Sequence, residues 1–297
     1  MASVLAQTYR DLELVVYDDR GDLEGVVRAS SDDRLRYHRA TRRLEASGRF
    51  AAAAALCRGR YLGMLDDDDR YEPEFVRRLL EALDEDPKAG VAFCRTTWEH
   101  SSGRSTPADP RPAGPQPDAV RDMIGMRWTV APSTMLMRRA ALDDAERAQR
   151  MPDGVAPDIF LNIRVAMAGW RHVLVDGRLV VRRWHAGQLS RALPAAYDRL
   201  VNTWRTLELR DPELAALRDR QLARMLLGRS MHRIGDGEPA SAREDLRAAA
   251  EASPAAWRGA RWLLRVAAAA GPAGRLAARA WLSSPGVKRR RTLPPGP

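Results

Sequence analysis

The sequence predicts an α/β layer fold over the first part of the chain and an all-helical region after it. Up to about residue 190, short apolar runs alternate with stretches whose apolar residues recur at helical spacing. This order is typical of a sheet covered by helices. From about Pro194 onward, runs of strand type stop, and Arg, Ala and Leu recur at helical spacing. We therefore expect one domain over residues 1–192 and a second, helical one over residues 193–297.

The predicted elements of the first domain are short. Strands are expected at 12–17, 61–65, 90–94, 170–175 and 179–181, the last two joined by a turn at Asp176-Gly177. Helices are expected at 48–58, 73–84 and 158–168. Strands separated by helices favour a mostly parallel sheet. Residues 128–137 are apolar without a clear period.

Proline and glycine mark the boundaries of the remaining segments. Five prolines in residues 101–118 predict a loop. In the second domain, breaks at 235–239, 253–254 and 271–272 suggest paired helices of the tetratricopeptide kind. The basic tail around 288–295 is predicted to be disordered.

The composition excludes several classes of protein. Of the 297 residues, 45% are hydrophobic and 30% are charged, which excludes collagen-like, mucin-like and wholly disordered chains. Two cysteines, Cys57 and Cys94, are too few for a disulfide scaffold or a cysteine-rich zinc site. No apolar run approaches the roughly 20 residues of a membrane helix, and no signal peptide is visible. We therefore expect a cytoplasmic protein.

The net charge of +10 is unevenly distributed. Residues 1–194 carry 30 basic and 29 acidic side chains, whereas residues 195–297 carry 19 and 10. A basic excess favours anionic partners, either nucleic acid or membrane headgroups. The arginines follow helical spacing without a nucleic-acid-binding motif, so we do not expect nucleic acid as a partner. Peripheral contact with an anionic membrane, at its inner face, is the alternative.

Acidic residues follow two of the predicted strands. Four carboxylates, Asp66 to Asp69, come directly after the strand at 61–65. Ligands of open α/β sheets bind at such strand ends, and a divalent cation relieves the repulsion among clustered carboxylates. A solvated acidic loop before a helix is an equally good interpretation. Asp18 and Asp19 form a second pair, suited either to a ribose or base or to an Asp-rich turn before Gly21.

Together with the stretches around them, these acids make the chain resemble the inverting family 2 glycosyltransferases. These enzymes have the GT-A fold, a Rossmann-like fold of nucleotide-diphospho-sugar transferases. The resemblance covers about residues 3–192. The stretches that carry it are 7–19, which ends in Asp18-Asp19; 58–69, which ends in the four aspartates; Tyr71-Glu72-Pro73-Glu74-Phe75; 158–169; and 182–190, which begins Arg182-Arg183-Trp184-His185.

The resemblance implies a role for each matching acid. Asp18, Asp19 and Asp67 would bind the nucleotide-sugar donor. Asp66 and Asp68, with His185, would hold Mn²⁺ or Mg²⁺ on the diphosphate. Asp158 would be the general base that takes a proton from the acceptor hydroxyl. Outside the resemblance, capping or charge-matching of a helix N-terminus is the favoured interpretation of Asp158, and a lone histidine such as His185 is more often structural.

The sequence also departs from the family pattern. The family opens with a strand and a turn that would precede Met1, so we expect a domain that lacks its first strand. Arg20-Gly21 follows the first acidic pair, Phe50-Ala51 replaces an Arg-Asn pair, and Pro157 replaces the acid before Asp158. We expect metal-dependent, inverting sugar transfer to a glycan or lipid-linked acceptor, in bacterial-type surface polysaccharide or glycoconjugate synthesis. The alternative is a catalytically impaired, transferase-like binding or scaffold protein.

Overall fold

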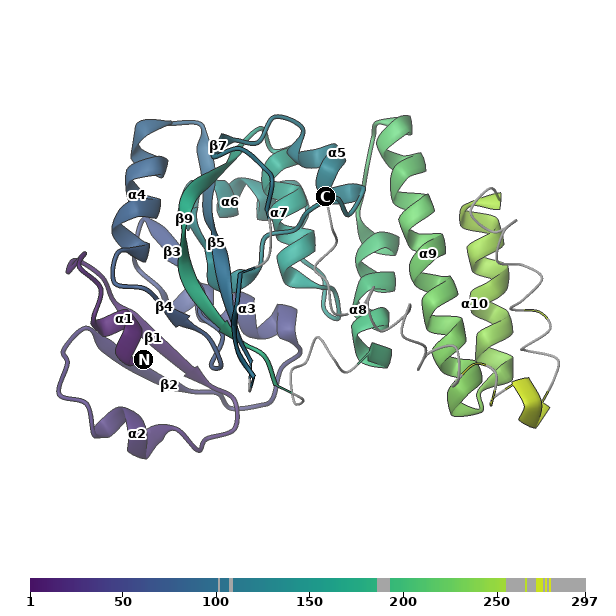
Figure 1. Cartoon of the computed structure of the whole chain (residues 1–297), viewed down its shortest axis with the longest axis horizontal. Coiled ribbons are helices and arrows are strands. Elements are labelled where there is room, and N and C mark those ends of the chain that lie inside the picture. The colour runs from purple at the N-terminus through teal and green to yellow at the C-terminus, as the bar shows by residue number, and fades with distance from the viewer. Residues whose placement is uncertain are drawn as a thin grey trace. The chain divides into compact units, whose positions relative to one another are not determined.

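The computed structural model describes residues 1–100, 102–106, 109–185 and 193–254, and a few positions after them (265, 271–274, 276 and 278). The end of the motif at 182–190, the expected domain boundary at 192 and the basic tail lie outside the described residues. The chain divides into two compact units (Figure 1). The α/β unit comprises Met1–Val120, Thr129–Asp153 and Pro157–Ala186, and the helical unit comprises Arg121–Trp128, Gly154–Ala156 and Gly187–Pro297.

The α/β unit begins with a small sheet of its own. The first elements are α1 (Ala2–Leu5), β1 (Leu14–Asp18), α2 (Glu24–Arg28), β2 (Leu35–Arg39) and α3 (Ala46–Leu56). Strands β1 and β2 pair in parallel, with Leu14 opposite Leu35 and Asp18 opposite Arg39. The acidic pair at 18–19 therefore lies at the carboxyl end of a parallel strand, as the sequence predicts.

A second, larger sheet forms the centre of this unit. Its strands are β3 (Tyr61–Gly63), β4 (Arg70–Tyr71), β5 (Ala89–His100), β6 (Gly103–Ser105), β7 (Gly114–Pro115), β8 (Met135–Arg138) and β9 (Arg171–Arg183). The central order is β3-β8-β5-β9-β4, while β6 pairs with β5 and β7 with β9. Only β5 and β9 run parallel among these described pairs. The expectation of a mostly parallel sheet is wrong, because β8 enters between β3 and β5 in the opposite direction.

The prediction of a turn at Asp176-Gly177 is also wrong. Strand β9 continues through it, because Cys94 pairs with Val175 and the next residue of β5, Arg95, pairs with Arg178. The two residues between them form a bulge, in which Gly177 has a φ of +128° and the Asp176 carboxylate accepts a hydrogen bond of 2.6 Å from Arg95. The added residues locally disturb the pairing without reversing the strand.

Helices cover both faces of the larger sheet (Figure 1). They are α4 (Phe75–Glu85), α6 (Arg139–Ala148) and α7 (Pro157–Met167), with the short elements α5 (Ala119–Ile124) and η1 (Pro132–Thr134) between them. Alternate strand residues divide between the faces. Ala92, Cys94, Leu136, Val173 and Val175 pack with α4 residues Phe75, Leu79 and Leu83. On the other face, Met135 and His172 contact Asn162 of α7.

The helical unit contains α8 (Leu193–Thr206), α9 (Pro212–Asp236) and α10 (Pro239–Ala252). Asp211 caps α9 by accepting hydrogen bonds from two backbone N–H groups, and Gly237 ends it at a φ of +88°. Arg229 of α9 forms ion pairs with Asp198 of α8 at 2.8 Å and with Asp245 of α10 at 2.6 Å. A separate cluster of buried apolar side chains, including Val201, forms the core here. None of the described helices is long and apolar enough to cross a membrane.

Candidate functional site

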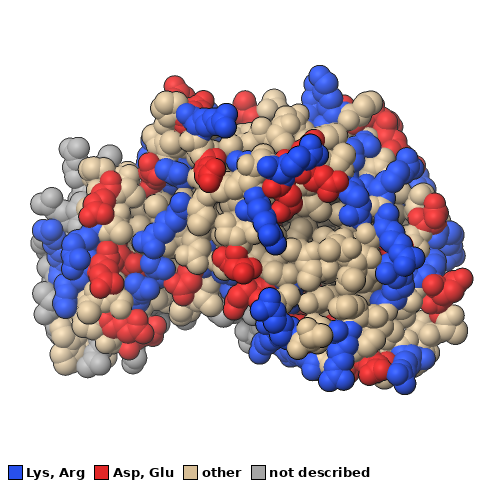
Figure 2. All heavy atoms as spheres, turned by 180° about the vertical axis from the view of Figure 1, so that it is seen from behind, with Lys and Arg blue, Asp and Glu red and all other residues tan. Residues whose placement is uncertain are grey.

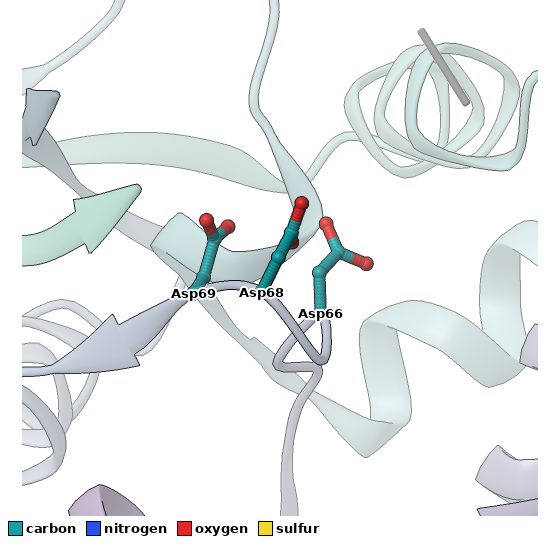
Figure 3. Close-up of side chains that lie close together, drawn as sticks. All are labelled: Asp66, Asp68 and Asp69. Atoms are coloured by element: carbon teal, nitrogen blue, oxygen red, sulfur yellow. The ribbon is translucent and has the colours of Figure 1, made fainter. Parts of the chain in front are cut away.

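Three aspartates gather in the turn between β3 and β4. We call Asp66, Asp68 and Asp69 the acid triad, because each offers a carboxylate oxygen within 4.8 Å of the others. Figure 3 shows that the three side chains leave the turn toward the same side. The turn is closed by the Asp69 backbone N–H, which donates to the Asp66 carbonyl at 3.1 Å.

Asp69 fastens this turn to the end of β9. Its side chain is 1% exposed. The Arg182 Nε donates to one carboxylate oxygen at 3.3 Å, and the Arg183 backbone N–H donates to the other at 3.2 Å. Ser133 of η1 joins them: its hydroxyl bonds the Asp69 carboxylate and accepts the Asp66 backbone N–H at 3.1 Å. The acids therefore sit on a turn that two other elements hold.

The electrostatics of the acid triad favour a cation. Burial raises the pKa of Asp66 to about 6; the charges of Asp69, Asp68 and Asp158 add to this effect, and the Arg182 guanidinium opposes it. Burial also raises the pKa of Asp69. A divalent cation would lower both values by neutralising this repulsion, and carboxylate oxygens are the ligands that Mg²⁺ and Mn²⁺ prefer. The residues present therefore fit such an ion.

Two further predicted residues lie beside the acid triad. The His185 Nε2 is 2.9 Å from the Asp68 carboxylate, and its side chain is 42% exposed. Asp158 lies in the first turn of α7, and its negative charge helps to raise the pKa of Asp66. The structure thus brings together residues that lie far apart in the chain.

Asp67, by contrast, is exposed and lies outside the acid triad. The donor residues expected at the first acidic pair lie in the smaller sheet. Asp18 is 3% exposed, and its two oxygens accept hydrogen bonds from the backbone N–H groups of Arg20, Gly21 and Leu23 and from the Tyr37 hydroxyl. Burial alone would raise the pKa of Asp18, but these bonds outweigh it and lower the value to about 2. Asp19 pairs with Arg49 at 3.1 Å.

Three residues of this site were not assigned a role from the sequence. Asp69 was visible as the last acid of the run, but its burial was not. Arg182 lay in a matching stretch without a distinguishing signal. Ser133 had no signal at all, because its contact with Asp66 joins positions 67 residues apart.

Comparison with known proteins shows a similarity to one family over the first part of the chain. Residues 1–145 match the model described as glycosyl transferase family 2. This match covers just under half of the chain, so the chain is similar to family 2 glycosyltransferases over its first 145 residues. The α/β unit has the GT-A fold, with its acid triad where β3 ends.

Solved structures agree with this fold. The chain is similar to residues 1–349 of TarS from S. aureus, with a TM-score of 0.61 and 16% identity over 94% of this chain and 85% of that one. Against a longer TarS structure the TM-score is 0.62, and the match spans 52% of that chain. The mannosyltransferase PcManGT from Pyrobaculum calidifontis, in complex with GDP-Man and Mn²⁺, has a TM-score of 0.57 and 18% identity over 99% of this chain and 78% of its own.

Proposed function

We propose that the chain transfers a sugar from a nucleoside diphosphate sugar to an acceptor hydroxyl, with inversion at the anomeric carbon. The observation that carries this proposal is the acid triad. His185 is hydrogen-bonded to Asp68, and the charge of Asp158 acts on Asp66. The family match of residues 1–145 supports the reaction class. The presence of GDP-Man and Mn²⁺ with the similar mannosyltransferase supports a donor of this kind.

Asp158 is the general base of the proposed reaction. Its carboxylate accepts the proton of the acceptor hydroxyl while that oxygen forms a bond to the anomeric carbon. The bond from the anomeric carbon to the diphosphate oxygen breaks at the same time, and the nucleoside diphosphate leaves with the electron pair. Attack from the opposite face inverts the configuration. Asp18, Asp19 and Asp67 are the residues proposed to contact the donor, and Asp18 also accepts hydrogen bonds from the backbone of its own turn.

Asp66 and Asp68 would hold Mn²⁺ or Mg²⁺, with His185 beside them. When bound, the ion would stabilise the negative charge that develops on the leaving diphosphate. The two oxygens of Asp69 already accept hydrogen bonds from β9, so Asp69 is less available as a ligand. Its role in this proposal is to keep the turn at 66–69 in place.

A thermal-shift panel tests the donor site. GDP, UDP, dTDP and CMP are added with and without Mn²⁺ to the wild type, to Asp68→Asn and to Asp33→Asn, a control at an exposed acid outside the site. A ligand at 100 times its Kd stabilises a protein by about 2.7 kcal/mol. We expect one nucleotide to give an Mn²⁺-dependent shift that Asp68→Asn abolishes. No shift with any nucleotide, from a folded protein, would contradict the proposal and favour the non-catalytic binding protein.

We also propose that the chain works at the inner face of an anionic membrane, which would carry a glycan or lipid-linked acceptor. Residues 193–254 contain ten basic and ten acidic side chains, whereas residues 255–297 contain nine basic ones and no acid. Figure 2 shows acidic and basic side chains interspersed over the described part of one face. The basic excess therefore belongs to the last part of the sequence, and such segments are attracted to anionic lipid.

Vesicle co-sedimentation tests this location. The full chain is compared with a variant that has serine at positions 288–291, on vesicles with and without anionic lipid. We expect binding only to anionic vesicles, weakened by salt and by the serine variant. Equal binding to neutral vesicles would contradict it.

A further inference from the structure

Strand β5 and the end of β9, which also contacts Asp69, carry a group of aromatic rings. We call Trp98, His100 and Trp184 the aromatic cluster. The rings of Trp98 and Trp184 meet edge to face, with centroids 5.4 Å apart and an interplanar angle of 77°. The His100 ring lies 5.6 Å from that of Trp184. All three side chains are half-buried, so part of each ring surface faces solvent.

Strand register places the cluster on one face of β5 and β9. Trp98 is directly opposite Arg182 in the parallel pair. Side chains two residues apart share a face of a strand, so His100 follows Trp98 and Trp184 follows Arg182 on that same face. The backbone holds the tip of β9 in position, because the Trp184 N–H donates to the Glu99 carbonyl at 2.7 Å.

Two direct connections join the aromatic cluster to the acid triad. The Arg182 guanidinium lies 4.6 Å from the centre of the Trp98 ring, and its Nε donates to Asp69. Trp184 is followed in the chain by His185, whose ring bonds Asp68. The cluster is therefore continuous with the residues that would hold the donor diphosphate.

This arrangement suits a carbohydrate ring. The face of an indole is electronegative, and the C–H groups on one side of a pyranose are weakly positive, so the two surfaces attract each other and exclude water. Polar atoms stand beside the rings: the His100 Nε2 lies 2.8 Å from the Ser105 hydroxyl of β6. Apolar surface with a few placed polar groups is the usual composition of a small-molecule site.

We propose that the aromatic cluster binds the acceptor, and that the acceptor is a pyranose whose ring packs against Trp184. This inference rests on the proposed sugar transfer. It adds the chemical class of the acceptor and the residues that select it. An acceptor held at this cluster lies next to the acid triad, where the donor would be bound.

Saturation-transfer NMR tests the acceptor class directly. The probes are the methyl glycosides of glucose, galactose, mannose and N-acetylglucosamine, with sorbitol as an open-chain polyol that has no ring face. Spectra are recorded with Mg²⁺ and the nucleoside diphosphate that gives the thermal shift. We expect ring-proton signals from at least one glycoside and none from sorbitol.

Three variants assign the signal to the cluster. Trp184→Leu removes the aromatic face and should weaken glycoside binding by about tenfold, whereas Trp184→Phe should retain most of it. Trp170→Leu is the matched control, because Trp170 is a half-buried tryptophan just before β9, at the other end of the strand. All three should keep the nucleotide-dependent thermal shift, which also shows that they fold.

The nucleotide thermal shift and the glycoside NMR signal together distinguish a failure of this inference from a failure of the proposed function. Intact nucleotide binding with no glycoside signal, or with a signal that Trp184→Leu leaves unchanged, would overturn the acceptor site alone. Absence of nucleotide binding in the wild type would instead overturn the transfer reaction on which the inference rests.

Discussion

At the scale of single residues, acids that look alike in the sequence have different surroundings. Asp67 is exposed, Asp68 bonds a histidine, and Asp69 is buried beneath two groups of β9. Asp18 differs again. A carboxylate has about four acceptor positions, and its turn and Tyr37 supply four donors. These contacts favour a role for Asp18 in shaping the turn, and its contact with a donor stays a prediction.

The neighbours Asp69 and Asp67 allow a matched test of burial. Asp69→Asn replaces one of two buried acceptor oxygens with an NH₂ group that faces the Arg182 Nε–H or the Arg183 backbone N–H, so we expect the free energy of unfolding to fall by about 1–3 kcal/mol. Asp67→Asn, on an exposed neighbour, should change it by less than about 0.5 kcal/mol. Urea denaturation at pH 7 measures both. Equal effects would mean that the contacts of Asp69 contribute nothing to stability.

At the scale of elements, prediction succeeded where local pattern and tertiary environment agree. The helix expected at 158–168 is Pro157–Met167, and the strand expected at 90–94 forms the start of β5. The second half of β5 was missed, because its polar and aromatic residues are held by pairing with β9 and β6 rather than by an apolar run. β8 was missed for a related reason: a strand of four residues has too few positions to show a period.

The same reasoning explains how much of the site was predictable. The acid run and His185 were visible in the sequence, because strand ends and family motifs are local signals. Ser133 and Arg182 were not, because their contacts with the turn at 66–69 exist only after the sheet has formed. Local sequence therefore indicates the acids, and tertiary packing decides which of them is buried.

The burial of His172 between β9 and α7 predicts how the free energy of unfolding depends on pH. His172 is fully buried against Asn162, and burial lowers its pKa to about 3. In the unfolded chain, the pKa of His172 is near the ordinary value of about 6.5. The neutral, buried histidine therefore makes its full contribution to the free energy of unfolding above pH 6.5, and this contribution is lost as the pH falls toward 3. The free energy of unfolding should fall by about 1.4 kcal/mol per pH unit in this range from this group.

His172→Gln removes that titration while it retains a polar side chain beside Asn162. Urea denaturation at pH 7.0 and 5.0 is compared for the variant and the wild type. The wild type should lose about 2 kcal/mol more than the variant between the two values. Parallel losses would show that His172 is protonated in the folded protein.

At the scale of the whole molecule, the two units have separate buried cores. The core on α4 belongs to the α/β unit, and the core around Val201 belongs to the helical unit. Units with cores of their own can unfold separately. We therefore expect calorimetry of the full chain to show two unfolding transitions, one for each unit.

Two perturbations assign these transitions. Asp211→Ala removes the N-cap of α9 and should destabilise the helical unit by about 1 kcal/mol, which lowers only one of the two midpoints. Mn²⁺ with the bound nucleotide should raise only the other midpoint, because the acid triad lies in the α/β unit and a ligand stabilises the unit that binds it. If both perturbations moved a single shared transition, the two units would unfold as one, and the donor site would then depend on the helical unit for its stability.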